Sequence, residues 1–247
     1  SNFRAGVNAG NSIESGGNQN TVIGDEAGTA ITTGIENVLI GHLTGDALTD
    51  ADFNVAVGRA ALSTDTLGSR STAIGQGALN VQNFTTATNT YNTAVGFFAG
   101  LSVTTGTSNT LIGGLTGDAL TTGADNTAIG TVALTADTLG SRSVAVGRGT
   151  LGTQNFTTAT LVYNVAVGYD AGAAVTTGAN NTLIGGLAGD AINTGTANVA
   201  VGTAALGALT SASYNTGIGY AALTTNVTGA QNTAVGYSAL TLATGAD

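Results

Sequence analysis

The chain has 247 residues, of which 8% are charged and 42% hydrophobic, with 39 Gly and no Pro, Cys, Met or Trp. Its net charge of −9 disfavours binding to nucleic acid and to anionic lipid, because both need clustered Lys and Arg. Its apolar runs are too short to insert into a membrane, and without Cys it forms neither disulfides nor thiolate metal sites.

Residues 1–19 fit no repeat well, and we expect them to form an N-terminal cap or junction. Residues 20–247 are expected to form one repetitive domain, because a five-residue phrase, Asn/Ser-x-x-Val/Ile-Gly, recurs throughout them. The phrase begins thirteen times, at residues 20, 37, 54, 71, 92, 109, 126, 143, 164, 181, 198, 215 and 232. The interval is 17 residues, except for the units that begin at 71 and 143, which have 21.

The two longer units define three super-repeats, residues 20–91, 92–163 and 164–247. The first two copies each contain three units of 17 residues and one of 21, and the third copy lacks the insertion of four residues. A period of this size is typical of solenoids, in which each repeat packs only on its neighbours.

Each phrase predicts a short strand that ends at a bend. Its fourth position is always Val or Ile, which favour strands, and its fifth is always Gly. A second short apolar segment follows each Gly, and we expect a second strand there. The predicted fold is therefore all-β, a parallel β-solenoid (β-roll) of about thirteen 17-residue coils.

The third position of the phrase predicts association between chains. It is Val, Leu, Ala or Gly, so the adjacent third and fourth positions, which face opposite sides of a strand, are both apolar. One face can line the coil, and the other needs a partner. We expect association between chains, with inter-chain packing through Ala94, Leu111, Ala128 and Leu183.

The phrase also carries a family resemblance. Residues 126–130 (Asn-Thr-Ala-Ile-Gly) and 232–240 resemble the Asn-Thr-Ala-Ile-Gly-x-x-Ala-Leu repeat of phage and phage-like tail fibres. They are also similar to the head repeats of trimeric autotransporter adhesins, although the period of this chain is longer. The resemblance covers about residues 20–247 and implies an extracellular trimer of parallel β-rolls that serves attachment.

The two insertions are the best candidates for a contact surface. Each presents an aromatic pair, Phe84 with Tyr91 and Phe156 with Tyr163. Long loops of solenoids often mark the binding face, and aromatic rings suit a host surface glycan or protein. The alternative is that Phe84 and Phe156 pack over the seam of the trimer.

No residue pattern indicates catalysis, a metal or a cofactor. The single His42 is expected at a surface bend, and the fourteen carboxylates are scattered. Asp46, Asp118 and Asp190 recur 72 residues apart, so at about 4.8 Å per layer they cannot share a proton. We also expect exposed ion pairs, Asp65 with Arg70 and Asp137 with Arg142, and a ladder of stacked Asn side chains at the first phrase position.

We therefore predict a non-enzymatic structural segment of an extracellular trimeric fibre of a phage or phage-like particle. It would act as a stiff spacer and as a surface for host attachment. A bacterial surface adhesin head is the near alternative. An ice-binding solenoid is a second alternative, although Val interrupts the Thr row at the second phrase position. A polysaccharide depolymerase is the enzymatic option, and the scattered carboxylates disfavour it.

Overall fold

A computed structural model describes residues 1–241 and divides the chain into two units, Ser1–Asp125 and Asn126–Asp247. Residues 1–241 consist of strands, turns and bends. No helix is present in this part of the chain, and hence none that could cross a membrane.

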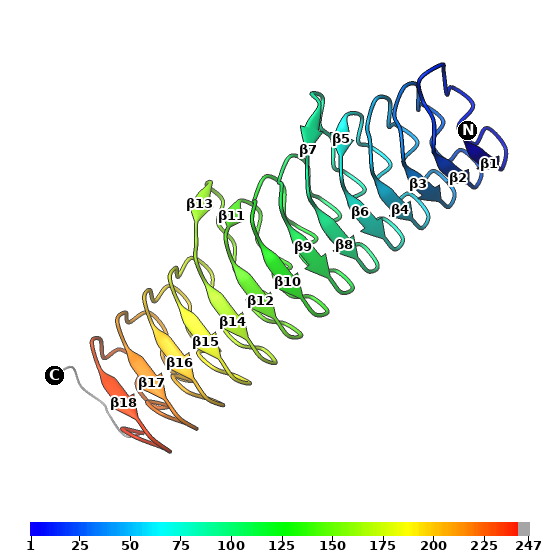
Figure 1. Ribbon diagram of the computed structural model, residues 1–247. Coiled ribbons are helices and arrows are strands. Elements are labelled where there is room, and N and C mark those ends of the chain that lie inside the picture. Colours follow the sequence, from blue (N-terminus) through cyan, green and yellow to red (C-terminus); the bar gives the residue numbers. More distant parts are fainter. Residues whose placement is uncertain (242–247) are drawn as a thin grey trace. The chain divides into compact units, whose positions relative to one another are not determined.

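The first unit is a parallel β-solenoid in which each turn contributes one strand to a common sheet (Figure 1). Neighbouring strands are parallel and pair residue by residue, so that Thr21, for example, lies beside Val38. Seven strands form this sheet, in the order β1 (Phe3–Ala5), β2 (Thr21–Ile23), β3 (Val38–Ile40), β4 (Val55–Val57), β6 (Thr72–Ile74), β8 (Thr93–Val95) and β9 (Thr110–Ile112).

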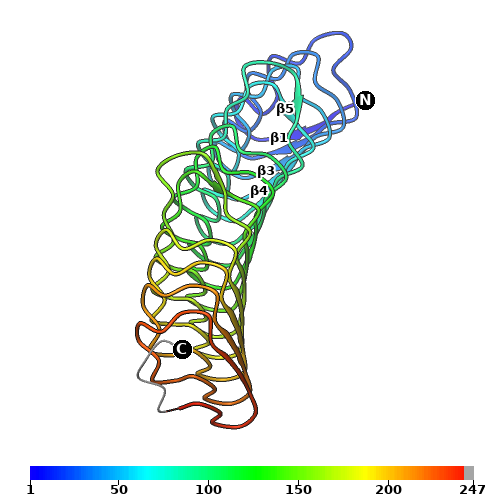
Figure 2. The ribbon, with the colours of Figure 1, turned by 90° about the vertical axis from the view of Figure 1, so that its left-hand side faces the viewer.

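The second unit repeats this architecture through residue 241. Its turns are stacked in register, as Figure 2 also shows for each unit. The sheet consists of β10 (Thr127–Ile129), β12 (Val144–Val146), β14 (Val165–Val167), β15 (Thr182–Ile184), β16 (Val199–Val201), β17 (Thr216–Ile218) and β18 (Thr233–Val235). The parallel β-solenoid predicted from the repeat is therefore confirmed.

Residues 1–19 extend the solenoid by one more turn. Their strand β1 pairs in parallel with β2, and Phe3 lies beside Thr21. Seven turns thus form the first unit, six of them from the phrase and one from the segment expected to be a cap or junction.

The Gly that ends each phrase is required by close backbone approach between turns. Gly24 has φ of 130°, and a Cβ there would lie 2.5 Å from the carbonyl oxygen of Gly41 in the next turn. Any side chain at this position would push the stacked turns apart, which explains why the phrase never varies here.

The two faces of the strands are the reverse of our expectation. The third phrase position points into the coil, so Ala94, Leu111, Ala128 and Leu183 are fully buried within their own chain. Their predicted role in inter-chain packing is wrong, because none of their surface is exposed to a partner chain. The fourth position, for example Ile184 at 39% exposure, faces outward instead.

The second apolar segment is buried as expected but is a turn, not a strand. Its residues Ala61 and Leu62 have no exposed surface, and Leu62 has a left-handed φ of 53°. The chain bends at Leu62, yet its N–H still donates to the Ala78 carbonyl of the next turn. The backbone hydrogen bonds between turns therefore continue at this bend, although the chain is not extended there.

In the interior, Leu occurs at the third or the ninth position of a turn, never at both, counted from the first residue of the phrase. Where the third position is Leu183, the ninth is Gly189 in the same turn and Gly172 in the turn before. A Cβ at either glycine would lie within 2.8 Å of a methyl of Leu183. Turns without a Leu nearby at the third position have Leu at the ninth, as in Ala200 with Leu206.

The Asn ladder is confirmed, and it bonds mainly to backbone. In the second unit, the Asn181 Oδ1 accepts the Asn198 N–H at 3.0 Å and its Nδ2 donates to the Gly195 carbonyl at 2.9 Å. Amide to amide bonds also occur, since the Asn198 Nδ2 lies 3.2 Å from the Asn181 Oδ1. The buried ladder joins each turn to the next and closes the bend beside the strand.

Candidate functional site

The outer sheet face is the first candidate surface, and we define it as the second and fourth phrase positions of each unit. The fourth position is always Val or Ile, and Ile74, Ile112, Ile184 and Ile218 keep 36–39% of their surface exposed. The second position is always Thr or Val. The face is therefore β-branched at every turn that the phrase forms, and it carries no charge at these positions.

The insertion of the first unit is anchored on a buried carboxylate. Asp65, which has no exposed surface, accepts N–H bonds from Gly68 at 3.1 Å and Phe84 at 2.9 Å. Its other oxygen accepts from the Gln82 Nε2 at 2.6 Å. The expected ion pair of Asp65 with Arg70 is wrong, because the carboxylate points into the interior and both of its oxygens accept hydrogen bonds there.

Gln82 also supplies the amide that the Asn ladder lacks at the turn with the insertion. The turn with the insertion begins with Ser71 instead of Asn, and Ser71 cannot reach the next rung. The Gln82 amide fills the gap, donating to the Ser71 Oγ at 2.8 Å and accepting from the Asn92 Nδ2 at 2.8 Å. Ser71 in place of Asn is the sequence signal that could have revealed this network.

The second unit repeats the anchor. Asp137 is buried, with Gln154 at 2.6 Å and the Phe156 N–H at 3.0 Å, so its expected ion pair with Arg142 is also wrong. Burial raises the pKa of Asp137, and the hydrogen bonds from Gln154 and Phe156 oppose this shift. Two short parallel sheets accompany the insertions, β5 (Gly68–Ser69) with β7 (Thr88–Asn89) and β11 (Gly140–Ser141) with β13 (Thr160–Leu161).

The two phenylalanines are not surface residues. Phe84 and Phe156 are each only 7% exposed within a single chain. Burial of both rings argues against their predicted contact with a host molecule, and packing over a trimer seam stays a prediction. The carboxylates of Asp65 and Asp137, which bind the N–H of each Phe from the preceding turn, hold these rings against their own unit.

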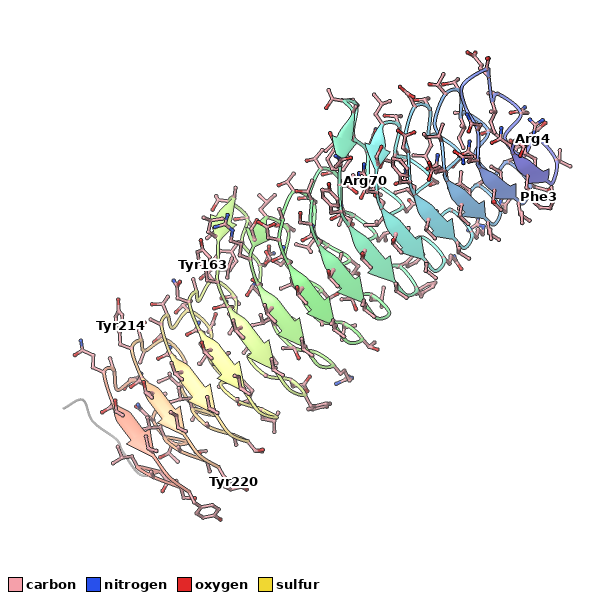
Figure 3. All side chains as sticks on the ribbon, viewed as in Figure 1. Phe3, Arg4, Arg70, Tyr163, Tyr214 and Tyr220 are labelled. Carbon is pink, nitrogen blue, oxygen red and sulfur yellow. The ribbon has the colours of Figure 1, made fainter. Side chains whose placement is uncertain are left out.

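The two tyrosines are exposed, Tyr91 by 58% and Tyr163 by 46%. In the second unit the Arg142 guanidinium lies 5.6 Å from the centre of the Tyr163 ring and donates to its hydroxyl at 2.6 Å. In the first unit Arg70 lies 4.7 Å from the ring centre of Phe53 and bonds the Asn89 Oδ1. Arginine and aromatic side chains thus gather on one border of each sheet, as the labels of Arg70 and Tyr163 show in Figure 3.

The tips of the insertions are polar and open to solvent. Residues 85–87 and 157–159 are exposed, and Figure 1 shows β7 and β13 on loops that project from the neighbouring turns of their units. These tips are small, with the sequence Thr-Thr-Ala in both copies.

The acidic side chains of residues 1–241 lie scattered along the two units. His42 is exposed at its bend as expected, and residues 1–241 contain no cluster of three His or acidic groups that could hold a metal. Burial raises the pKa of Asp46 and of Asp190, the two recurring aspartates for which a shift is resolved. No pocket forms among the residues that the structure describes.

No family model, curated protein or solved structure matches this chain. The surfaces of the chain that a partner could contact are the outer sheet face, its borders and the two projecting loops.

Proposed function

We propose that this chain is a structural segment of an extracellular trimeric fibre of a phage or phage-like particle, acting as a stiff spacer and as a surface for host attachment. The observation that carries the proposal is the uninterrupted β-branched outer sheet face. The resemblance to tail-fibre repeats supports the same assignment and is the reason for proposing three chains.

The outer sheet face suits burial against identical faces. Closing the exposed part of Ile74, Ile112, Ile184 or Ile218, now 36–39% open, contributes on the order of 1 kcal/mol for each side chain at about 25 cal/mol per Å². Each unit has six or seven turns with Val or Ile at this position, which makes the total several kcal/mol per chain, against the entropic cost of association. The trimer interface therefore moves from the third phrase position to the fourth.

Sedimentation equilibrium tests the assembly. We expect a trimer for the wild-type chain and a folded monomer for Ile184→Glu/Ile218→Glu, because both new charges, which lie two turns apart on the outer sheet face, would be desolvated in the interface. The matched control, Thr177→Glu/Ser211→Glu, changes exposed residues outside the outer sheet face and should stay trimeric. A monomeric wild-type chain would contradict the proposal.

Attachment is assigned to the loop tips, which are exposed and make no contribution to the core. Replacing residues 85–87 and 157–159 by Gly-Ser-Gly should abolish binding to an array of bacterial surface polysaccharides while the trimer persists. Unchanged binding would remove the loops from this role.

Ice binding is the second candidate, because it would use the same face. The Thr residues of the second phrase position do point outward, for example Thr182 and Thr216, although Val199 separates them. A monomer that shows thermal hysteresis would favour ice binding over the fibre.

A further inference from the structure

Positive charge is rare in this chain, and part of it lies beside the two insertions. The sequence has five Arg and no Lys, against fourteen acidic residues. Arg70 is the last residue before the turn that carries the first insertion, and Arg142 is the last residue before the turn that carries the second. An exposed cation next to a projecting loop, in a chain that is acidic overall, favours a ligand with negative charge.

The Arg70 side chain is held on two sides. Its Cζ lies 4.7 Å from the centre of the Phe53 ring in the preceding turn, and its Nε donates to the Asn89 Oδ1 at 2.9 Å in the following turn. Within residues 1–241, Arg70 takes part in no ion pair, and its two Nη groups donate to no acceptor. The edge of the guanidinium that can bind a carboxylate through two parallel hydrogen bonds is therefore fixed in place and open.

Tyr91 supplies an exposed ring beside Arg70. Both residues stand just before the phrase, in consecutive turns whose strands β6 and β8 pair in register, so their backbones lie about 4.8 Å apart. Tyr91 is 58% exposed, and in the part of the chain that the structure describes it stacks on no other ring and lies under no cation. Its ring is therefore available to an external partner.

We propose that Arg70 and Tyr91 form a binding site for an acidic polysaccharide. The Nη groups of Arg70 bind the carboxylate of a uronic-acid residue through two hydrogen bonds, and the ring of Tyr91 packs on a sugar ring of the same glycan. The inference rests on the attachment role proposed above and names the class of glycan that is bound. Both residues lie outside the outer sheet face, which the proposed trimer buries.

The groups around Arg70 select this class of ligand. A neutral glycan would leave the open edge of the guanidinium without a partner. An acidic peptide would satisfy Arg70, but it has less use for the exposed ring of Tyr91 and for the exposed hydroxyls of Thr85 and Thr86 on the same loop. A uronic acid combines a carboxylate, hydroxyls and a ring with an apolar face, and thus matches all three kinds of group.

The second unit has the same loop tip but a different arrangement beside it. Leu161 stands where the first unit has Asn89, so the hydrogen bond that orients Arg70 has no equivalent. Arg142 lies over Tyr163 instead, 5.6 Å from its ring centre, and donates to its hydroxyl at 2.6 Å. The cation and the ring bind each other there, so we assign the site to the first unit, and the second unit provides a matched control.

Calorimetric titration of the full chain tests the site, with oligosaccharides of galacturonate and of glucuronate as probes and their methyl esters as uncharged counterparts. We expect binding of at least one acidic probe, weaker at higher salt, and no binding of its ester. Arg70→Gln and Tyr91→Ala should each weaken this binding at least about tenfold, and Arg70→Lys, which keeps the charge without the planar fork, should restore only part of it. The matched controls Arg142→Gln and Tyr214→Ala should leave the affinity unchanged.

Three results would overturn the inference: no binding of either acidic probe, equal binding of a methyl ester, or unchanged affinity in Arg70→Gln. Equal affinity for an oligoglutamate peptide that survives Tyr91→Ala would also overturn it, because the site would then be an ion pair for any polyanion. Sedimentation equilibrium of the same samples separates this inference from the fibre proposal. A trimer that binds no uronate refutes the acidic-glycan site alone, whereas a monomer that binds it refutes the trimeric fibre and leaves the site standing.

Discussion

The exchange of Leu between the third and ninth positions makes a quantitative prediction for the core. Leu183 is fully buried, and replacing it by Ala should destabilise the chain by about 2–5 kcal/mol, because a cavity remains. Gly189→Leu alone should cost about 1–3 kcal/mol, because its Cβ would lie 2.8 Å from methyls of Leu183 and Ile192. Its backbone is no obstacle, since Leu206 adopts φ of 54° at the same position.

The double variant Leu183→Ala/Gly189→Leu should be more stable than either single variant. It recreates the arrangement of Ala200 with Leu206 in the next turn, so the new side chain fills the space that Leu183 vacates. The two substitutions should therefore couple by at least about 2 kcal/mol, within the range measured for residues in contact.

Guanidinium unfolding followed by far-UV circular dichroism measures this coupling, at one fixed chain concentration because association shifts the midpoint. The matched control is Leu183→Ala with Thr177→Leu, which adds an exposed Leu outside the cavity. If the double variant loses the sum of the two single losses, the third and ninth positions do not share one volume and the packing rule is wrong.

Three further predictions concern buried or half-buried polar groups. Asn181→Ala should cost about 1–3 kcal/mol in the same unfolding assay, because the buried Asn198 N–H loses its acceptor. Asp65→Ala should speed amide exchange at Phe84 by about 10-fold or more, with little change in distant turns, because the insertion loses its anchor. The pKa of Asp46 is raised mainly by burial, so its contribution to stability is present below the usual pKa of 3.8 and is lost as pH rises through the raised value. Asp46→Asn should therefore gain stability relative to the wild type from about pH 3 to about pH 7, and an unchanged difference would exclude this linkage.

The sequence predicted the strands, the obligatory Gly and the Asn ladder because each depends on a repeated local pattern. It did not predict which face of the strand is inside, because alternation shows only that neighbouring positions face opposite ways. The position of the Asn ladder does indicate which face of the strand is buried. Asn181 and Leu183 are two residues apart and share a face, so a buried Asn also places Leu183 in the interior.

The surroundings of Phe84 and Phe156 could not be predicted for a different reason. Each Phe is held by a carboxylate 19 residues earlier, Asp65 or Asp137, in the preceding turn. Nothing in the spacing of the repeat indicates such a bond. From the sequence alone, an aromatic residue in an insertion resembles a binding residue, because the polar network that holds it is known only from the structure.

That network explains where a solenoid of this kind can carry a loop. Each turn depends on a buried amide that joins it to the next, so an insertion beside the ladder would leave polar groups without partners. In the first unit Ser71 opens the ladder, Gln82 closes it again, and Asp65 binds the displaced backbone. The third super-repeat has Asn215 in place of Ser, and it has no insertion. Loop and network therefore form one structural module, and a loop grafted onto another turn should fold only when all three polar residues accompany it.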